Sequence, residues 1–165
     1  MKNKKHIQIR QGVFETNSSS THSIIINYSD TFDDIPNISA IKATGDEFGW
    51  ENESYNDFYT KLNYIITYLF GSCESEEDYN KIKNKKEYKL LVEVLKTETG
   101  IDLYVPSIIE AKENAQYNFD YYGYIDHQSC DVAEEVFKSY QDLSCFLFNS
   151  SSILYTGNDN DYDYY

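Results

Sequence analysis

Residues 54–71 read SYNDFYTKLNYIITYLFG, and their apolar pattern decides the expected fold. Apolar side chains recur at the spacing of one face of an α-helix. They are Phe58, Leu62, Ile65, Ile66 and Leu69. Ser54 is of a residue type that caps helix N-termini, and Gly71 is of the type that ends helices. The stretch therefore predicts a helix from about Tyr55 to Phe70 with one side buried.

Alternating and short apolar runs around this helix predict strands and further helices. The predicted strands are His6–Arg10, Ser23–Tyr28, Ile101–Val105, Phe119–Ile125 and Ser152–Thr156. Further helices are predicted from Ser75 through Leu95 with a stop at Gly100, over Ser107–Gln116, and after a cap at Asp131. Residues 28–49 read as a long loop, and residues 157–160 as a turn. These elements predict a single α+β domain over residues 1–160, with about five strands in a mixed sheet and three or four helices. Residues 161–165 form an acidic, tyrosine-rich tail.

The chain carries 28 acidic and 14 basic residues, which gives a formal net charge of −14. Binding to duplex nucleic acid requires a basic face that neutralises phosphates, so this charge argues against duplex nucleic acid as a partner. An acidic surface can instead occupy a basic groove on another protein, or serve solubility alone.

No apolar run approaches the ~18 residues that a membrane-spanning helix needs, so no membrane partner is expected. The basic N-terminus leads into an alternating strand instead of an apolar signal core. Three scattered cysteines, at positions 73, 130 and 145, fit a reducing compartment better than a disulfide framework. We therefore expect a cytoplasmic protein.

A polar run between the first two predicted strands is the strongest candidate for a binding site. Hydroxyl, amide and backbone N–H groups in such a run can cradle an anion. The candidate ligand-binding residues in and beside the run are Arg10, Glu15, Asn17, Ser18, Ser19, Ser20 and Thr21. Arg10 is the only arginine of the chain, and arginine alone offers a rigid bidentate fork to a phosphate. The alternative is a hydroxyl-rich turn whose side chains satisfy their own backbone.

Histidines are the natural proton carriers at neutral pH, and two of them stand near polar clusters. His22 ends the serine-rich run, and His127 follows Asp126 at the end of a predicted strand. These three residues are the candidate catalytic residues. Ser129 is a further candidate ligand contact. Each histidine is also consistent with an ordinary loop or strand position.

Two more segments are candidates for ligand contact. Residues 156–160, TGNDN, supply Asn158, Asp159 and Asn160. They are consistent with an ordinary turn and with an oxygen-rich site for a hard cation. Trp50, the only tryptophan, lies beside Gly49 among acidic residues. It is either an anchor for its loop or a platform that faces a ligand.

The common nucleotide, metal and hydrolase signatures do not occur in the chain. There is no GxxxxGK[ST], GxGxxG, HExxH or GxSxG segment, and the cysteines have no close metal spacing. The sequence therefore names no cofactor and no metal.

The segment RQGVFETNSSSTHS at residues 10–23 resembles the opening of an uncharacterised family of small proteins from tailed phages and prophages. Three shorter segments carry the same resemblance: Phe-Gly-Trp at 48–50, Ile-Asp-His-Gln-Ser at 125–129 and Thr-Gly-Asn-Asp-Asn at 156–160. They follow one another in order and span the domain. The resemblance implies a phage-type protein in the host cytoplasm, and it implies no activity.

Two functional hypotheses follow from these features. In the first, the four segments converge in space and form a polar pocket for a phosphate-bearing small molecule or nucleotide. Arg10 would clamp the anion, His22 or His127 would move protons, and Asp126 or Asp159 would orient a histidine or hold a cation. In the second, the protein is an acidic phage inhibitor, similar in kind to an anti-CRISPR protein, that binds a host defence nuclease or effector through its charge.

Overall fold

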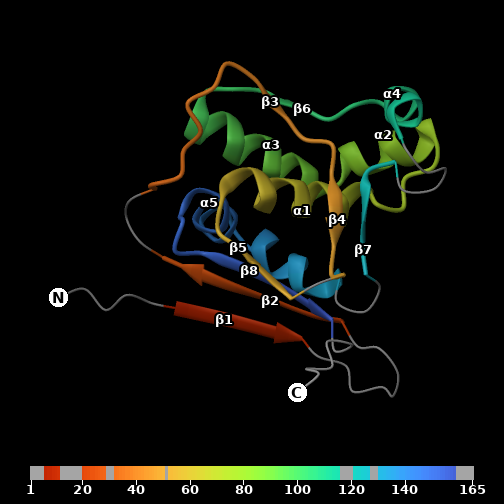
Figure 1. The fold of residues 1–165 in the computed structure, drawn as a ribbon. Helices are drawn as coiled ribbons and strands as arrows, with labels where there is room; N and C mark the ends of the chain where they lie inside the picture. Colours follow the sequence, from red (N-terminus) through yellow and green to blue (C-terminus); the bar gives the residue numbers. More distant parts are fainter. Residues whose placement is uncertain are drawn as a thin grey trace.

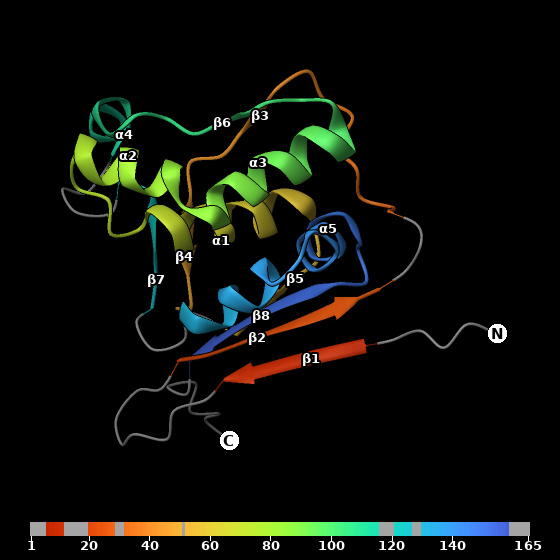
Figure 2. The same ribbon diagram turned by 180° about the vertical axis from the view of Figure 1, so that it is seen from behind.

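A four-stranded antiparallel sheet forms one side of the protein, and all the helices that the structure describes lie on one face of this sheet (Figures 1 and 2). The computed structural model describes residues 6–11, 20–28, 32–50, 52–115, 121–126 and 130–158. The sheet has the strand order β1 (His6–Gln11), β2 (Ser20–Asn27), β8 (Ile153–Asn158) and β5 (Glu53–Tyr55).

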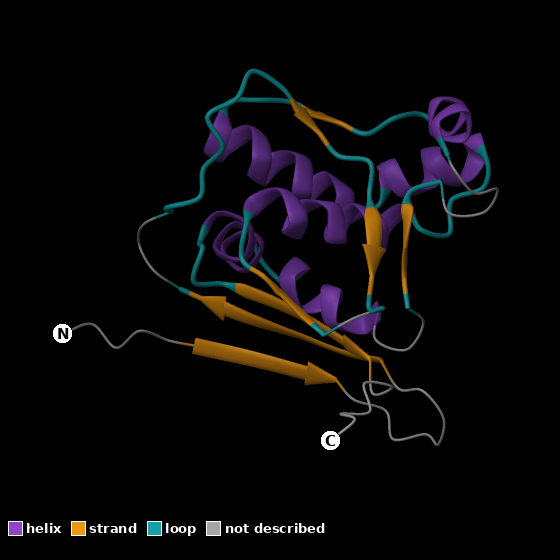
Figure 3. Cartoon of the chain, viewed as in Figure 1, coloured by secondary structure: helices purple, strands orange, loops and turns teal. Residues whose placement is uncertain are grey.

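Two short parallel pairs complete the strands. β3 (Ile41–Lys42) pairs with β6 (Leu103–Tyr104), and β4 (Asp46–Phe48) pairs with β7 (Gly123–Ile125). The helices are α1 (Phe58–Phe70), α2 (Glu76–Asn84), α3 (Lys86–Thr99), α4 (Ile108–Asn114), the 3₁₀ helix η1 (Cys130–Phe137) and α5 (Tyr140–Phe148). Figure 3 separates these two classes of element by colour. The predicted α+β class is confirmed.

Alternation along β2 and β8 builds the core face of the sheet. His22, Ile24 and Ile26 are buried along β2, whereas Ser23 and Ile25 between them are only half-buried. In β8, Leu154 and Thr156 are buried in the same way. Because side chains alternate between the two faces of a strand, one face of each strand packs against the helices.

Helix α1 is the centre of the core. All five residues of its predicted apolar stripe are buried, as are Tyr64 and Lys61. The helix begins at Phe58 and not at Tyr55, because the Asp57 carboxylate caps it by accepting a hydrogen bond from Thr60 N at 2.9 Å. The predicted cap at Ser54 is wrong, because Ser54 lies in β5. Gly71 ends the helix as predicted, donating its N–H to Thr67 O at 2.7 Å.

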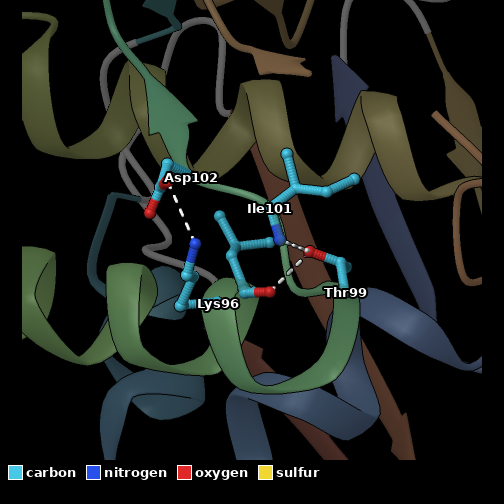
Figure 4. Close-up of polar contacts among 5 residues, drawn as sticks. Lys96, Thr99, Ile101 and Asp102 are labelled. Carbon is cyan, nitrogen blue, oxygen red and sulfur yellow. Dashed lines mark hydrogen bonds and ion pairs between the residues drawn. The ribbon is translucent and has the colours of Figure 1, made fainter. Parts of the chain in front are cut away.

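Helices α2 and α3 replace the single long helical region that the sequence predicts from Ser75. Lys85 between them has extended backbone angles, which breaks the helix. The predicted stop at Gly100 is correct, since this glycine adopts a left-handed conformation with φ of 73°. Figure 4 shows the end of α3, where Thr99 Oγ1 accepts a hydrogen bond from Ile101 N and Lys96 pairs with Asp102.

Other boundaries also differ from the prediction. The predicted loop over residues 28–49 contains β3 and β4, which are too short to show an alternating pattern. The helix predicted after Asp131 is the 3₁₀ helix η1, followed by α5 with Ser139 as its cap. The turn predicted at 157–160 is wrong at its first two positions. Gly157 and Asn158 extend β8 by pairing with Thr21 and Ser20.

A buried lysine holds α1 to the connection between α5 and β8. The Lys61 side chain has no exposed surface, and its Nζ donates hydrogen bonds to Asn149 O at 3.0 Å and Ser152 O at 3.4 Å. Ser152 Oγ in turn accepts from Asn27 N at 2.9 Å and donates to Cys145 O at 2.8 Å. These bonds join α1, α5, β2 and the start of β8 around one turn.

Burial lowers the pKa of Lys61 from 10.5 to about 8, although Asp34, Asp57 and Asp33 oppose the shift. Between these values the unfolded chain binds the proton and the folded chain has released it, so folding becomes more favourable as the pH rises. We expect the free energy of unfolding of the wild type, relative to Lys61→Met, to increase by about 1–2 kcal/mol from pH 8 to pH 10. Urea unfolding of both proteins at several pH values measures this difference.

The comparison with Lys61→Met cancels the titration of tyrosines, which both proteins share. A difference between the two proteins that stays constant from pH 8 to pH 10 would contradict the assignment of Lys61 as a buried titrating ammonium.

Candidate functional site

Four segments that are distant in the sequence meet at one corner of the protein. It lies where β2 begins and β8 ends, and where β4 and β7 run down to the sheet (Figures 1 and 2). A Cβ placed on Gly49 would lie 2.9 Å from His22 Nε2 and 3.0 Å from Asp126 Cβ. We call the residues His22, Gly49, Asp126 and Thr156 the His22 corner.

The two strand ends beyond β4 and β7 are tied together by backbone bonding. Asp126 N donates to Phe48 O at 2.9 Å, which continues the parallel pairing one residue past β7. This bond fixes Gly49 beside Asp126. Gly49 has a φ of 98°, a conformation that side chains rarely adopt, and a side chain there would also collide with the His22 ring. Glycine is therefore required at this position for two independent reasons.

His22 is fully buried and is held by a tyrosine of the central helix. Its Nδ1 lies 3.2 Å from Tyr64 Oη, and the two rings are 5.9 Å apart. Burial lowers the pKa of His22 to about 4, and the nearby Asp126 carboxylate only partly offsets this. The imidazole is therefore neutral at pH 7. In the neutral ring one nitrogen donates and the other accepts, so the bond to Tyr64 decides which role is left to Nε2.

Two buried polar atoms of the corner lack a hydrogen-bond partner within the described part of the chain. They are His22 Nε2 and Thr156 Oγ1. The two residues are direct cross-strand partners, because His22 in β2 pairs with Thr156 in β8. Leaving a buried polar group unsatisfied costs about 1–3 kcal/mol. Two such groups side by side mark a place where the ligand-free protein tolerates a cost in stability.

A groove of about 400 Å³ runs beside the corner over β8 and β5. It is lined by Ser23, Asn52, Glu53, Ser54, Tyr155, Thr156 and Gly157. Its size falls within the range of small-molecule sites. Ser23 and Tyr155 of this lining alternate with His22 and Thr156 along their strands, so their side chains lie on the other face of the sheet from the two buried side chains of the corner.

The structure brings part of the predicted site together. Ser20 and Thr21 form the first positions of β2, and Ser20 pairs with Asn158 in β8. Arg10 lies in β1 opposite Ser23, so its backbone is one residue from the position that faces His22. Asp126 lies at the corner itself, and Trp50 directly follows Gly49 in the chain. Several predicted residues lie outside the described residues: Glu15, Asn17, Ser18, Ser19, His127, Ser129, Asp159 and Asn160. The tail at 161–165 also lies outside them.

Sequence reasoning missed three residues of this site. Tyr64 lies in the predicted central helix but is not part of its predicted apolar stripe, and a tyrosine buried in a helix needs a partner for its hydroxyl group. Gly49 and Thr156 stood in recognised segments but were not chosen as site residues. The sequence offers one signal for each of these two residues. Gly49 stands beside the only tryptophan, and Thr156 occupies an alternating buried position of a predicted strand.

Comparison with known proteins gives no assignment. No protein-family model matches the chain, and neither the curated proteins nor the solved structures contain a significant match. Within the described ranges, no three potential metal ligands are grouped. No helix in those ranges has the length and hydrophobicity needed to cross a membrane. The site must therefore be interpreted from its own chemistry.

The unpartnered Thr156 hydroxyl predicts a contrast between two buried threonines. Thr156 and Thr67 are each 3% exposed, but Thr67 Oγ1 accepts from Asp46 N at 2.9 Å and donates toward Asp46 O and Asn63 O. We expect Thr67→Val to lower the free energy of unfolding by about 1–3 kcal/mol, because it leaves Asp46 N unsatisfied. Thr156→Val should leave that free energy unchanged or raise it by up to about 1 kcal/mol.

Urea unfolding of the two variants beside the wild type measures the contrast. Equal losses in both would show that the Thr156 hydroxyl has a partner in the folded protein.

Burial of the His22 imidazole predicts a second pH dependence of stability. It lies on the acidic side of pH 7, whereas that of Lys61 lies on the basic side. Between pH 6.5 and about pH 4 the unfolded chain binds a proton at His22 and the folded chain does not, so stability falls as the pH decreases. We expect the wild type to lose up to about 3 kcal/mol more than His22→Gln over this range. Urea unfolding across the range measures the loss, and NMR titration of the His22 ring gives its pKa directly. A midpoint near 6.5 would mean that the ring is exposed to water.

Proposed function

We propose that the His22 corner binds a phosphate-bearing small molecule, with nucleotides as the leading class. The observation that carries this proposal is a pair of buried atoms, His22 Nε2 and Thr156 Oγ1, that have no hydrogen-bond partner among the described residues, at the point where four segments meet. A phosphate oxygen can accept hydrogen bonds from a hydroxyl and from an imidazole N–H at once.

The connection between β1 and β2 carries further candidate donors in its sequence. Residues 12–19 connect β1 to the start of β2, and they contain most of the serine-rich run. Both ends of this connection, Gln11 and Ser20, belong to paired strands at the corner. The connection between the two strands thus begins and ends beside the corner, which supports the proposal.

A bound phosphate would change the protonation of His22. The ring has a pKa of about 4 because its burial disfavours the charged form. A dianion in hydrogen-bond contact favours the charged form and raises the pKa. Binding would then couple to proton uptake, and His22 would exchange a proton with the ligand. Tyr64 would hold the ring during this exchange.

The setting we propose is a phage-encoded protein in the host cytoplasm. The four segments that carry the resemblance to a phage family are the ones that supply described residues to the corner: 10–23, 48–50, 125–129 and 156–160. This coincidence supports a shared binding role for them.

A second candidate function is the acidic inhibitor of a host defence nuclease or effector. The net charge of −14 favours it. Such binding would weaken steeply between low and high salt, because exposed charges are screened within about 10 Å at 0.1 M ionic strength. It would also be indifferent to His22→Gln, since His22 is buried. These two properties separate it from the pocket hypothesis.

Isothermal titration calorimetry with ribose 5-phosphate tests the pocket hypothesis. We expect binding by the wild type, at least tenfold weaker binding by Thr156→Val and by His22→Gln, and a similar loss with Arg10→Lys, because each variant loses a donor or its geometry. Ser144→Ala, a buried change in α5 away from the corner, should bind as the wild type does. Performing the titration in buffers of different ionisation enthalpy gives the proton uptake.

Absence of heat with ribose 5-phosphate and with the four ribonucleoside monophosphates would refute the proposed function. Undiminished affinity in both Thr156→Val and His22→Gln would move the binding site away from this corner.

A further inference from the structure

Trp50 presents an exposed aromatic face beside the His22 corner. Its side chain is 57% exposed, whereas Phe48 and Gly49 directly before it are buried. The indole ring lies 6.0 Å from the ring of Tyr124, with 32° between the planes. An aromatic residue that anchors its loop buries most of its ring in the core. Trp50 does not, so an anchoring role leaves its exposed face unexplained.

The chain holds this aromatic pair in a fixed place. Tyr124 lies in β7 opposite Glu47 in β4, and the bond from Asp126 N to Phe48 O closes the pair of strands below it. Trp50 follows Gly49, whose Cα is packed against the His22 ring and Asp126. The Cα atom of Trp50 is therefore one peptide unit, about 3.8 Å, from the Cα atom of Gly49 in the corner.

Charge explains why an aromatic surface is useful here. The protein has a net charge of −14, and Asp46, Glu47 and Asp126 surround the pair in sequence. This field opposes the binding of a phosphate and limits the affinity that the phosphate group alone can supply. Stacking of a neutral ring on an aromatic side chain supplies affinity that does not depend on charge.

We propose that Trp50 and Tyr124 form a stacking platform for the base of a mononucleotide whose phosphate occupies the His22 corner. This inference rests on the proposed function and adds to it the class of ligand. It selects nucleoside monophosphates over sugar phosphates, and over nucleoside triphosphates, which carry more negative charge.

The test compares ligands that differ only in the base. Isothermal titration calorimetry is performed with ribose 5-phosphate and with each of the four ribonucleoside monophosphates. We expect at least one monophosphate to bind about 5- to 100-fold more tightly than ribose 5-phosphate, which is the range that base stacking on an aromatic residue supplies. Because Trp50 is the only tryptophan, the same monophosphate should quench the tryptophan fluorescence, and ribose 5-phosphate should not.

Variants test which side chains supply the gain. Trp50→Leu and Tyr124→Leu should reduce the affinity for the monophosphate to that for ribose 5-phosphate, and leave ribose 5-phosphate binding within about twofold. The matched control is Tyr104→Leu, which removes a ring that is 45% exposed in β6, at the opposite end of the protein (Figure 1). It should bind both ligands as the wild type does. Thermal unfolding of each variant confirms folding.

The outcomes separate this inference from the proposed function. Equal affinity for ribose 5-phosphate and all four monophosphates would overturn the stacking platform and leave the phosphate site intact. A tighter monophosphate whose affinity survives both Trp50→Leu and Tyr124→Leu would also overturn the platform. Absence of binding by every ligand would overturn both proposals.

Discussion

The buried ammonium group of Lys61 is the constraint on which the rest of the structure depends. It donates hydrogen bonds to the carbonyl groups of Asn149 and Ser152, in the turn between α5 and β8. A buried charge is costly unless it is hydrogen-bonded. If the turn moved away from α1, the ammonium group would lose its hydrogen bonds and the folded state would be destabilised. This turn sets where β8 begins, and β8 is the strand that joins β2 to β5. The start of β8 is therefore anchored to the central helix by the two hydrogen bonds of Lys61.

The same helix also positions the candidate site. Tyr64 lies one turn after Lys61 in α1, and residues three apart share a helix face. Lys61 thus fixes the strand that carries Thr156, and Tyr64 contacts the ring of His22. A third side chain, Phe48, packs edge-on against Tyr64 at 5.1 Å and brings the end of β4 to the same place. The corner is rigid because three contacts to a single buried helix define it.

The sequence predicted the parts of the fold that depend on local chemistry. The stripe on α1, the stops at Gly71 and Gly100, and the strands around Ile24 and Leu154 follow from periodicity and from glycine conformation. The short pairs β3–β6 and β4–β7 could not be predicted, because two or three residues carry no period and their partners are far away in the chain. For the site, the polar segments were visible, but their meeting point was not. It depends on Tyr64 and Gly49, whose importance arises only from the packing of distant elements.

Sheet order has a consequence for how the protein is made. Asn27 and Ser152, which bond across the β2–β8 boundary, are separated by 125 positions. During synthesis, β2 is therefore made long before β8, its second partner strand. Until β8 is made, the apolar side chains of Ile24 and Ile26 remain uncovered. Contacts between residues so distant in the chain slow folding, and the apolar surface that stays exposed meanwhile favours aggregation. The nascent chain should acquire its helical part first and close the sheet only when β8 leaves the ribosome, so the His22 corner is the last part of the protein to take shape.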